Sequence, residues 1–192
     1  MDIVREAPGA LQNHRSNSPI SLLQSALSLY NNRPHSGFRL NFVYTRCFAL
    51  IHTAVTMAYF LAKTDPETYT IDQLEQDKHT DWDGVTNAQA VNAIKLMRPG
   101  DKVFIYHSGG ESSIRGLAKV TSAPRPDPKL PKSYIAGFQF LKRLAPPTTL
   151  AEVKQSELFG QWGLVRNSRL STMAAPDEFV EWMRRRYPKA KI

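Results

Sequence analysis

The stretch from Trp82 to Asn87, with the sequence Trp-Asp-Gly-Val-Thr-Asn, constrains the fold of this 192-residue chain more than any other segment. Asp-Gly favours a tight turn, because glycine adopts positive φ readily and the Asp side chain can bond the backbone two residues on. Asn87 precedes a helical run over residues 88–97 and is a strong candidate N-cap. Trp82 would then lie beside free amides at a helix start, an arrangement that suits a flat polar ligand such as a nucleobase. The alternative interpretation is that Trp82 is a core aromatic and that Asn87 only caps the helix.

Strands and helices follow one another along residues 58–187 in an order typical of an α+β fold. We expect strands at 58–63, 102–107, 114–120 and 134–144, helices beginning near Thr70, Asn87, Thr149 and Pro176, and a strand or turn at 164–170. Thr70 with Gln73, and Thr149 with Glu152, have capping-box spacing. Residues 108–113 predict a hairpin loop, and the proline-rich residues 123–132 predict a linker. A small curved or barrel-like sheet with helices at its flank fits this order.

The net charge of +8 is concentrated at the two ends of the chain. Residues 1–56 carry five arginines against two acidic residues, whereas residues 57–183 carry fifteen basic and fifteen acidic residues. Because residues 57–183 carry no net charge, we do not expect them to form the broad basic surface that binds long nucleic-acid duplexes. A local groove with a few cations is compatible with this charge balance. The basic run at the end predicts a solvated tail at 188–192, with a phosphate contact or localisation signal as the second interpretation.

The N-terminal extension, residues 1–56, has a composition unlike that of the body. No acidic residue occurs from Ala7 to Thr64, while arginine and serine are frequent, which is typical of organelle transit peptides. A translation start at Met57 is the alternative. The apolar segment 47–62 is too short to span a membrane. We expect the extension to be poorly ordered or absent from the mature protein, and the domain to be cytoplasmic. Plastid, mitochondrion or nucleus are the alternatives if a targeting signal is present.

Catalytic and metal sites are weakly indicated. One cysteine and five scattered histidines argue against a disulfide framework and against a structural zinc site. His107 and Ser108 could imitate a Ser/His pair, but neighbouring strand residues face opposite sides. Asp81 and Asp83 are spaced like paired carboxylates, yet Asp is common in turns for local reasons. We therefore expect no cofactor, no metal ion and no enzymatic activity. A nucleotide-modifying or hydrolytic enzyme using His107 and Asp83, and a protein-interaction module using the basic tail, are the alternatives.

Aromatic and cationic residues gather near the expected loops and favour binding of nucleic acid. They are Trp82, Tyr106, Phe159 and Trp162, with Lys63, Arg166 and Arg169 in the same neighbourhoods. Aromatic platforms with a few cations bind flipped or single-stranded bases, and stacking contributes roughly 1–3 kcal/mol per base. Each of these aromatics taken singly is also explained as a core residue.

Several segments match the EVE domain family in sequence and in their order along the chain. They are Y-F-L-A-K-T-D-P (59–66), W-D-G-V-T-N-A-Q-A (82–90), M-R-P-G-D-K-V-F-I-Y-H (97–107), the Tyr/Phe-rich residues 134–144, L-A-E-V-K (150–154) and L-V-R-N-S-R-L-S (164–171). The chain thus resembles an EVE domain of the PUA-like superfamily, and its core is most similar to the bacterial-type branch. The resemblance implies a PUA-like small β-barrel with flanking helices over residues 57–187. It also implies a monomeric domain that binds a modified base in DNA or RNA and does not contact a membrane.

The resemblance, together with the aromatic residues, gives a set of expected ligand-binding residues. They are Lys63, Thr64, Asp65, Trp82, Asn87, Tyr106, His107, Ser108, Trp162, Arg166, Ser168 and Arg169. We expect Trp82 to stack on the base, Asn87 to bond its edge, and Tyr106 with Trp162 to close the pocket. We expect the cations to contact phosphate. Thr86 and Ala88 replace an Arg and a Tyr that are common in the family, so one cation and one aromatic of the family pattern are missing.

Overall fold

The computed structural model describes residues 57–110 and 112–192, so the expectations for residues 1–56 lie outside the described part. The elements in chain order are β1 (Tyr59–Thr64), α3 (Ile71–Asp77), β2 (His79–Trp82), α4 (Ala88–Leu96), β3 (Lys102–His107), β4 (Ser113–Val120), β5 (Arg125–Pro126), β6 (Tyr134–Thr149), α5 (Leu150–Gln155), α6 (Gly163–Arg166), β7 (Thr172–Ala174) and α7 (Asp177–Arg186). The predicted α+β class is confirmed.

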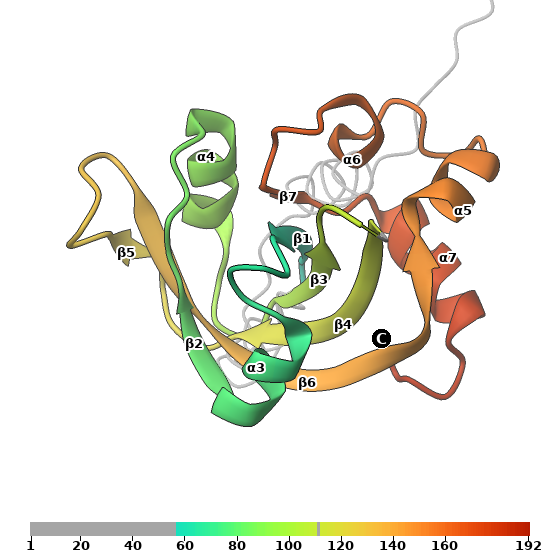
Figure 1. Cartoon of the computed structure of the whole chain (residues 1–192), viewed down its shortest axis with the longest axis horizontal. Helices are drawn as coiled ribbons and strands as arrows, with labels where there is room; N and C mark the ends of the chain where they lie inside the picture. Colours follow the sequence, from blue (N-terminus) through green and yellow to red (C-terminus); the bar gives the residue numbers. More distant parts are fainter. Residues whose placement is uncertain (1–56, 111) are drawn as a thin grey trace, which may run out of the picture. The chain divides into compact units, whose positions relative to one another are not determined.

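One curled, mixed sheet organises the described residues (Figure 1). Its strand order is β2-β6-β4-β3-β1-β7, and the short β5 pairs with β6. β1 and β3 are parallel, while the other pairs are antiparallel. The register shifts at Ile105/Tyr106 of β3 and again twice between β4 and β6. Such bulges bend strands and increase their twist, and here they accompany the half-barrel shape of the sheet.

The core lies between the sheet and the helices that cover it. Phe104 of β3 is fully buried, and its ring centroid lies 5.9 Å from that of Tyr59 and 5.6 Å from that of Phe179. Phe179, Val180 and Met183 form the buried face of α7. Burying a side chain of this size contributes about 1.5–3 kcal/mol. The contacts of Phe104 therefore hold α7 against the centre of the sheet.

The side-chain hydrogen bonds predicted to cap three of the helices are confirmed. Thr70 and Thr149 each form a complete capping box, with Gln73 and Glu152 respectively. Asn87 caps α4, because its Oδ1 accepts the amides of Gln89 and Ala90. Local hydrogen bonds of this kind depend on residues three positions apart, which explains why the sequence predicts them well.

The structure differs from the sequence predictions where pairing partners are distant in the chain. The strand or turn expected at 164–170 is wrong in part, since Gly163–Arg166 forms the short helix α6. The strands β2, β5 and β7 were not predicted, and each is at most four residues long. Pro176 is the N-cap of α7 and not its first helical residue. Within the described residues, no helix is long and apolar enough to cross a membrane.

Candidate functional site

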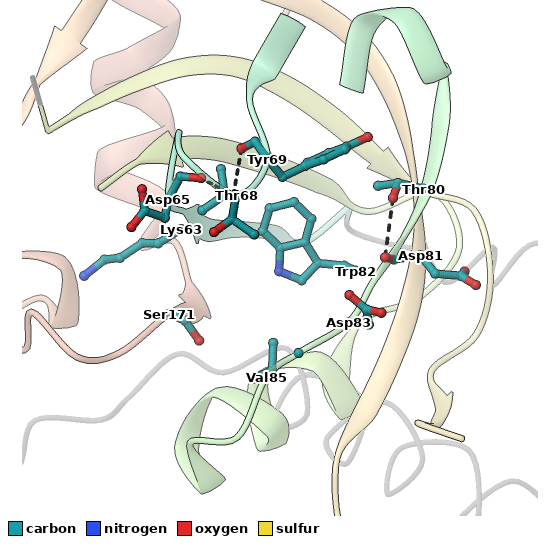
Figure 2. A pocket seen from close by; sticks show the side chains of 12 residues that line it. Lys63, Asp65, Thr68, Tyr69, Thr80, Asp81, Trp82, Asp83, Val85 and Ser171 are labelled. Carbon is teal, nitrogen blue, oxygen red and sulfur yellow. Dashed lines mark hydrogen bonds between the residues drawn. The ribbon is translucent and has the colours of Figure 1, made fainter. Parts of the chain in front are cut away.

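A cavity of about 390 Å³ lies where β1 ends, beside β2 and the loop that follows it (Figure 2). Its wall comes from three segments of the chain that the fold brings together, residues 63–69, residues 80–85 and Ser171. The lining residues are Lys63, Thr64, Asp65, Thr68, Tyr69, Thr80, Asp81, Trp82, Asp83, Gly84, Val85 and Ser171. Four of the twelve expected site residues are among them: Lys63, Thr64, Asp65 and Trp82.

Trp82 forms part of the wall and part of the core. Its side chain is 8% exposed and stacks on Phe138 of β6, with ring centroids 5.1 Å apart and planes 22° apart. The nitrogen-bearing edge of the indole is turned toward Ser171 and Val85, which also line the cavity (Figure 2). In residues 57–110 and 112–192, no group accepts a hydrogen bond from Nε1 of Trp82. Trp82 therefore offers the cavity an apolar wall and an unused N–H donor.

Lys63 joins the end of β1 to the loop that precedes β7. Its Nζ donates to the carbonyl oxygens of Asn167 and Ser168, each at 3.3 Å, and its backbone amide donates to Ser171 at 2.7 Å. The ammonium also lies 5.8 Å from the ring centroid of Tyr106. Burial lowers the pKa of Lys63 below its ordinary value of 10.5, because desolvation disfavours the charged form. These contacts fix a cation at one edge of the cavity.

The loop from Asp65 to Tyr69 is held by local hydrogen bonds. Thr64 Oγ1 donates to the carbonyl oxygen of Tyr69 at 2.8 Å, and Asp65 Oδ1 accepts the amide of Glu67 at 3.0 Å. The carbonyl oxygen of Asp65 accepts the amides of Thr68 and Tyr69, both at 2.9 Å. The loop is thereby closed on itself, and it presents Thr68 and Tyr69 to the cavity.

Tyr106, His107 and Ser108 lie behind this wall and do not line the cavity. Ser108 donates through both its amide and Oγ to the carbonyl oxygen of Thr64, at 2.8 and 3.0 Å. His107 Nε2 accepts the amide of Ile71 at 3.0 Å, which fixes the start of α3. Burial, followed by the positive charge of Arg115, lowers the pKa of His107, while Asp72 opposes this shift. The end of β3 thus supports the loop between β1 and α3.

The other expected residues occupy places outside the cavity wall. The Oδ1 atom of Asn87 is used for the α4 cap. Trp162 is 9% exposed, its Nε1 donates to the carbonyl oxygen of Ala174, and its ring lies 4.5 Å from that of Phe179. Arg166, Ser168 and Arg169 are exposed, and Arg166 hydrogen-bonds to Gln161. Ser168 is nevertheless linked to the cavity, because its carbonyl oxygen binds Lys63.

Comparison with known proteins identifies the domain. Residues 58–186 match the EVE domain family. This chain belongs to the EVE domain family. Its curled sheet with flanking helices is accordingly a PUA-like fold.

Relatives of this EVE domain include curated proteins and solved structures. Thymocyte nuclear protein 1 of Homo sapiens is 37% identical over 82 residues, which cover 36% of this chain and 36% of the human protein. The chain thus spans only about a third of the length of the curated relatives that it matches. The NMR structure of Rpa0253 from Rhodopseudomonas palustris has a TM-score of 0.62 and 32% identity, covering 66% of this chain and 90% of that one. Human THYN1, crystallised in complex with DNA containing 5-methylcytosine, has a TM-score of 0.60 and 25% identity, covering 66% of this chain and 95% of that one.

The cavity of this EVE domain carries acidic groups that are matched by cations from a distant segment. Arg125 Nη2 lies 2.6 Å from Asp81 Oδ2, and Lys129 Nζ lies 3.2 Å from Asp83 Oδ2. All four side chains are substantially exposed. The described residues contain no cluster of three or more His, Cys, Asp or Glu side chains that could hold a metal ion.

Several residues of the site were not predicted from the sequence. Thr68, Tyr69 and Ser171 line the cavity, and Arg125 and Lys129 form ion pairs with Asp81 and Asp83, which also line it. Ser171 is the last residue of the segment 164–171 that resembles the family, which is the single signal that could have indicated it. The proline-rich segment predicts only a linker, because its ion pairs with Asp81 and Asp83 span more than forty positions of the chain.

Proposed function

We propose that this EVE domain binds nucleic acid carrying a modified base, and that the cavity beside Trp82 accepts that base without catalysing a reaction. The supporting observation is an unused indole N–H at a cavity of about 390 Å³. This volume lies near the lower end of the roughly 300–1,000 Å³ that is typical of small-ligand sites. A single base is a ligand of suitable size and polarity for such a cavity.

The groups around the cavity complement the edges of a pyrimidine. Trp82 and Tyr69 supply aromatic surface, and Nε1 of Trp82 supplies a donor for a ring carbonyl. The Ser171 hydroxyl and the carboxylate of Asp65 supply acceptors, and carboxylates accept hydrogen bonds from the amino group of cytosine. These contacts favour a cytosine derivative as the first ligand to test, in agreement with the DNA found bound to human THYN1.

The base must leave its helix to enter the cavity. Extrusion costs a few kcal/mol, and least for unpaired or damaged bases. Because the body of the chain carries equal numbers of basic and acidic residues over 57–183, charge attraction to an intact duplex contributes little. We infer that a single strand or an already weakened pair binds best. In this proposal Lys63, Arg166 and Arg169 meet the phosphates on one side of the base.

A non-catalytic role is favoured by the positions of the two residues considered for an enzyme. Asp83 lines the Trp82 cavity, whereas His107 lines a separate cavity with Arg115 and Arg143. Nε2 of His107 already accepts the amide of Ile71, so this nitrogen is occupied in the folded domain. The two side chains therefore do not face one substrate.

Binding of paired oligonucleotides tests the proposal. Fluorescence anisotropy would compare single strands of one sequence that contain either one 5-methylcytosine or one cytosine. Wild type is expected to prefer the modified strand. Trp82→Phe keeps an aromatic ring on Phe138 but removes the N–H donor, so it should weaken binding of the modified strand roughly fivefold, the effect of about 1 kcal/mol for one hydrogen bond.

Trp162→Phe is the matched control, because it removes an indole N–H from a buried tryptophan outside the cavity. Its affinity for both strands should equal that of wild type. The proposal is wrong if Trp82→Phe binds both strands as wild type does, or if wild type does not distinguish them.

A further inference from the structure

The segment from Thr121 to Tyr134 forms a hairpin beside the Trp82 cavity. It contains four prolines and the cations Arg125, Lys129 and Lys132, with Asp127 as its one acidic residue. β5 pairs with the start of β6, Arg125 opposite Ile135 and Pro126 opposite Tyr134. In Figure 1 this hairpin extends from the sheet on the side of β2. The segment is therefore a defined structural element and not a loose linker.

Hydrogen bonds hold the tip of the hairpin in one conformation. Asp127 Oδ1 accepts the amides of Lys129 and Leu130, at 2.7 and 3.3 Å, and the amide of Asp127 donates to Ser133 at 3.0 Å. Ser133 Oγ donates to the carbonyl oxygen of Val85 at 2.7 Å in a buried contact. Val85 lines the cavity, so the hairpin is attached directly to the cavity wall. A preorganised element loses little conformational entropy when it binds a ligand.

The hairpin places two cations beside Asp81 and Asp83, two residues of the cavity lining, in ion pairs that solvent can reach. Arg125 pairs with Asp81 and Lys129 with Asp83, and the side-chain exposures lie between 46% and 77%. Exposed ion pairs contribute little to stability, so either cation can change its partner at small cost. Phosphate accepts bidentate hydrogen bonds from arginine as carboxylate does. Without the two cations, the negative charges of Asp81 and Asp83 would be unpaired and would repel a phosphodiester.

We propose that this hairpin binds the sugar–phosphate backbone next to the base in the cavity. Arg125 and Lys129 leave Asp81 and Asp83 and contact two phosphates when a strand enters. The inference rests on the proposed function, because it supplies the backbone contact for a base held beside Trp82. The hairpin adds affinity that does not depend on the identity of the base, since phosphates carry no sequence information.

The salt dependence of binding tests this contact in the full chain. The probe is a single strand with one 5-methylcytosine, and the affinity is measured between 50 and 300 mM NaCl. Each phosphate contact to a single strand contributes about 0.7 to the slope of log K against log salt concentration. The double variant Arg125→Ala/Lys129→Ala should therefore lower the magnitude of the slope by about 1.4. It should weaken binding of modified and unmodified strands by the same factor.

Lys154→Ala/Arg185→Ala is the matched control, because it removes two exposed cations from α5 and α7 and should leave the slope unchanged. Asp81→Asn frees Arg125 without removing a cation, and it should tighten binding. An unchanged slope in the hairpin variant, or weaker binding by Asp81→Asn, overturns the inference.

The same assay separates the two proposals. If Trp82→Phe keeps full affinity for the modified strand while the hairpin variant loses slope, the cavity proposal fails and the backbone contact stands. If Trp82→Phe loses affinity for the modified strand but the hairpin variant behaves as wild type, the backbone contact fails and the cavity proposal stands.

Discussion

Trp82 takes part in folding and lines the candidate site with the same side chain. One ring face packs on Phe138, while its Nε1 has no acceptor among the described residues. Removing the whole side chain would open a buried void and cost about 3–5 kcal/mol of stability. Trp82→Ala would therefore confuse loss of binding with loss of folding. Phenylalanine at this position separates the two, because it removes the donor and retains most of the packing.

His107 makes stability depend on pH in a direction set by its surroundings. Burial and Arg115 lower the pKa of His107 in the folded state below its ordinary value of 6.5, with Asp72 opposing them. The unfolded state then binds the proton more readily, so stability is present above pH 6.5 and is lost as pH falls below it. Protonation of Nε2 would also break the hydrogen bond from Ile71. Urea unfolding of the full chain should show a free energy of unfolding that declines from pH 7.5 toward pH 5.

His107→Gln is the comparison for this prediction. Its side-chain oxygen can accept the amide of Ile71 but does not titrate, so the decline between pH 7.5 and pH 5 should be smaller than in wild type. Equal declines in the two proteins would show that other groups govern the pH dependence.

At the scale of elements, Gly116 sets the distance at which α3 packs on the sheet. A Cβ at this position would lie 2.6 Å from Ile71 Cδ1 of α3 and 2.9 Å from the carbonyl oxygen of Lys142 in β6. The side chain of Ile71 can move, but the backbone oxygen belongs to a paired strand. Gly116→Ala should therefore lower the free energy of unfolding by about 1–3 kcal/mol, as overpacked cores do.

Gly160→Ala is the control for this substitution, because nothing lies within 4 Å of the added Cβ. Its free energy of unfolding should stay within about 0.5 kcal/mol of wild type. Chemical denaturation of both variants measures the difference. A Gly116→Ala protein as stable as the Gly160→Ala protein would contradict the packing described for α3.

The elements that the sequence predicts well are those defined by neighbouring residues. Thr70 with Gln73 and Thr149 with Glu152 specify helix starts through contacts three residues apart. The short strands β2 and β7 depend instead on pairing with β6 and β1, which lie far away in sequence. His79–Trp82 is polar and four residues long, so its composition alone gives no strand signal.

At the scale of the whole molecule, Tyr187 joins the end of α7 to the far end of β6. Its hydroxyl donates to the carbonyl oxygen of Pro146 at 2.5 Å and lies 2.7 Å from Thr148 Oγ1, which is fully buried. Tyr187→Phe would remove both hydrogen bonds and leave the buried Thr148 Oγ1 with only the weak acceptor Met183 Sδ at 3.8 Å, so it should cost about 1–3 kcal/mol of unfolding free energy. Tyr69→Phe removes only an exposed hydrogen bond to Asp77 and should cost less in the same denaturation assay. Equal losses would contradict this role of Tyr187.

In the candidate site, too, the sequence predicts residues that belong to contiguous motifs but not residues that distant strand pairing brings to the cavity. Lys63, Thr64, Asp65 and Trp82 belong to contiguous motifs that the sequence displays, and they line the cavity. His107 ends such a motif and Ser108 follows it directly, yet both residues support the wall from behind. The places of Ser171, Arg125 and Lys129 follow only from how the sheet curls and pairs. The sequence indicates which segments meet, and the fold decides which side chains of those segments face the cavity.

One base should occupy the cavity beside Trp82, and NMR of the indole N–H groups can detect it there. The chain has three tryptophans, at positions 82, 162 and 182, so a ¹⁵N-labelled sample gives three indole signals. Trp82→Phe assigns the signal of Trp82 by its disappearance. On titration with a single strand carrying one 5-methylcytosine, that signal should shift strongly while the signal of Trp162, whose N–H is bonded to Ala174, stays in place. A Trp82 signal that does not move at saturation, or that moves no more than that of Trp162, would contradict the claim.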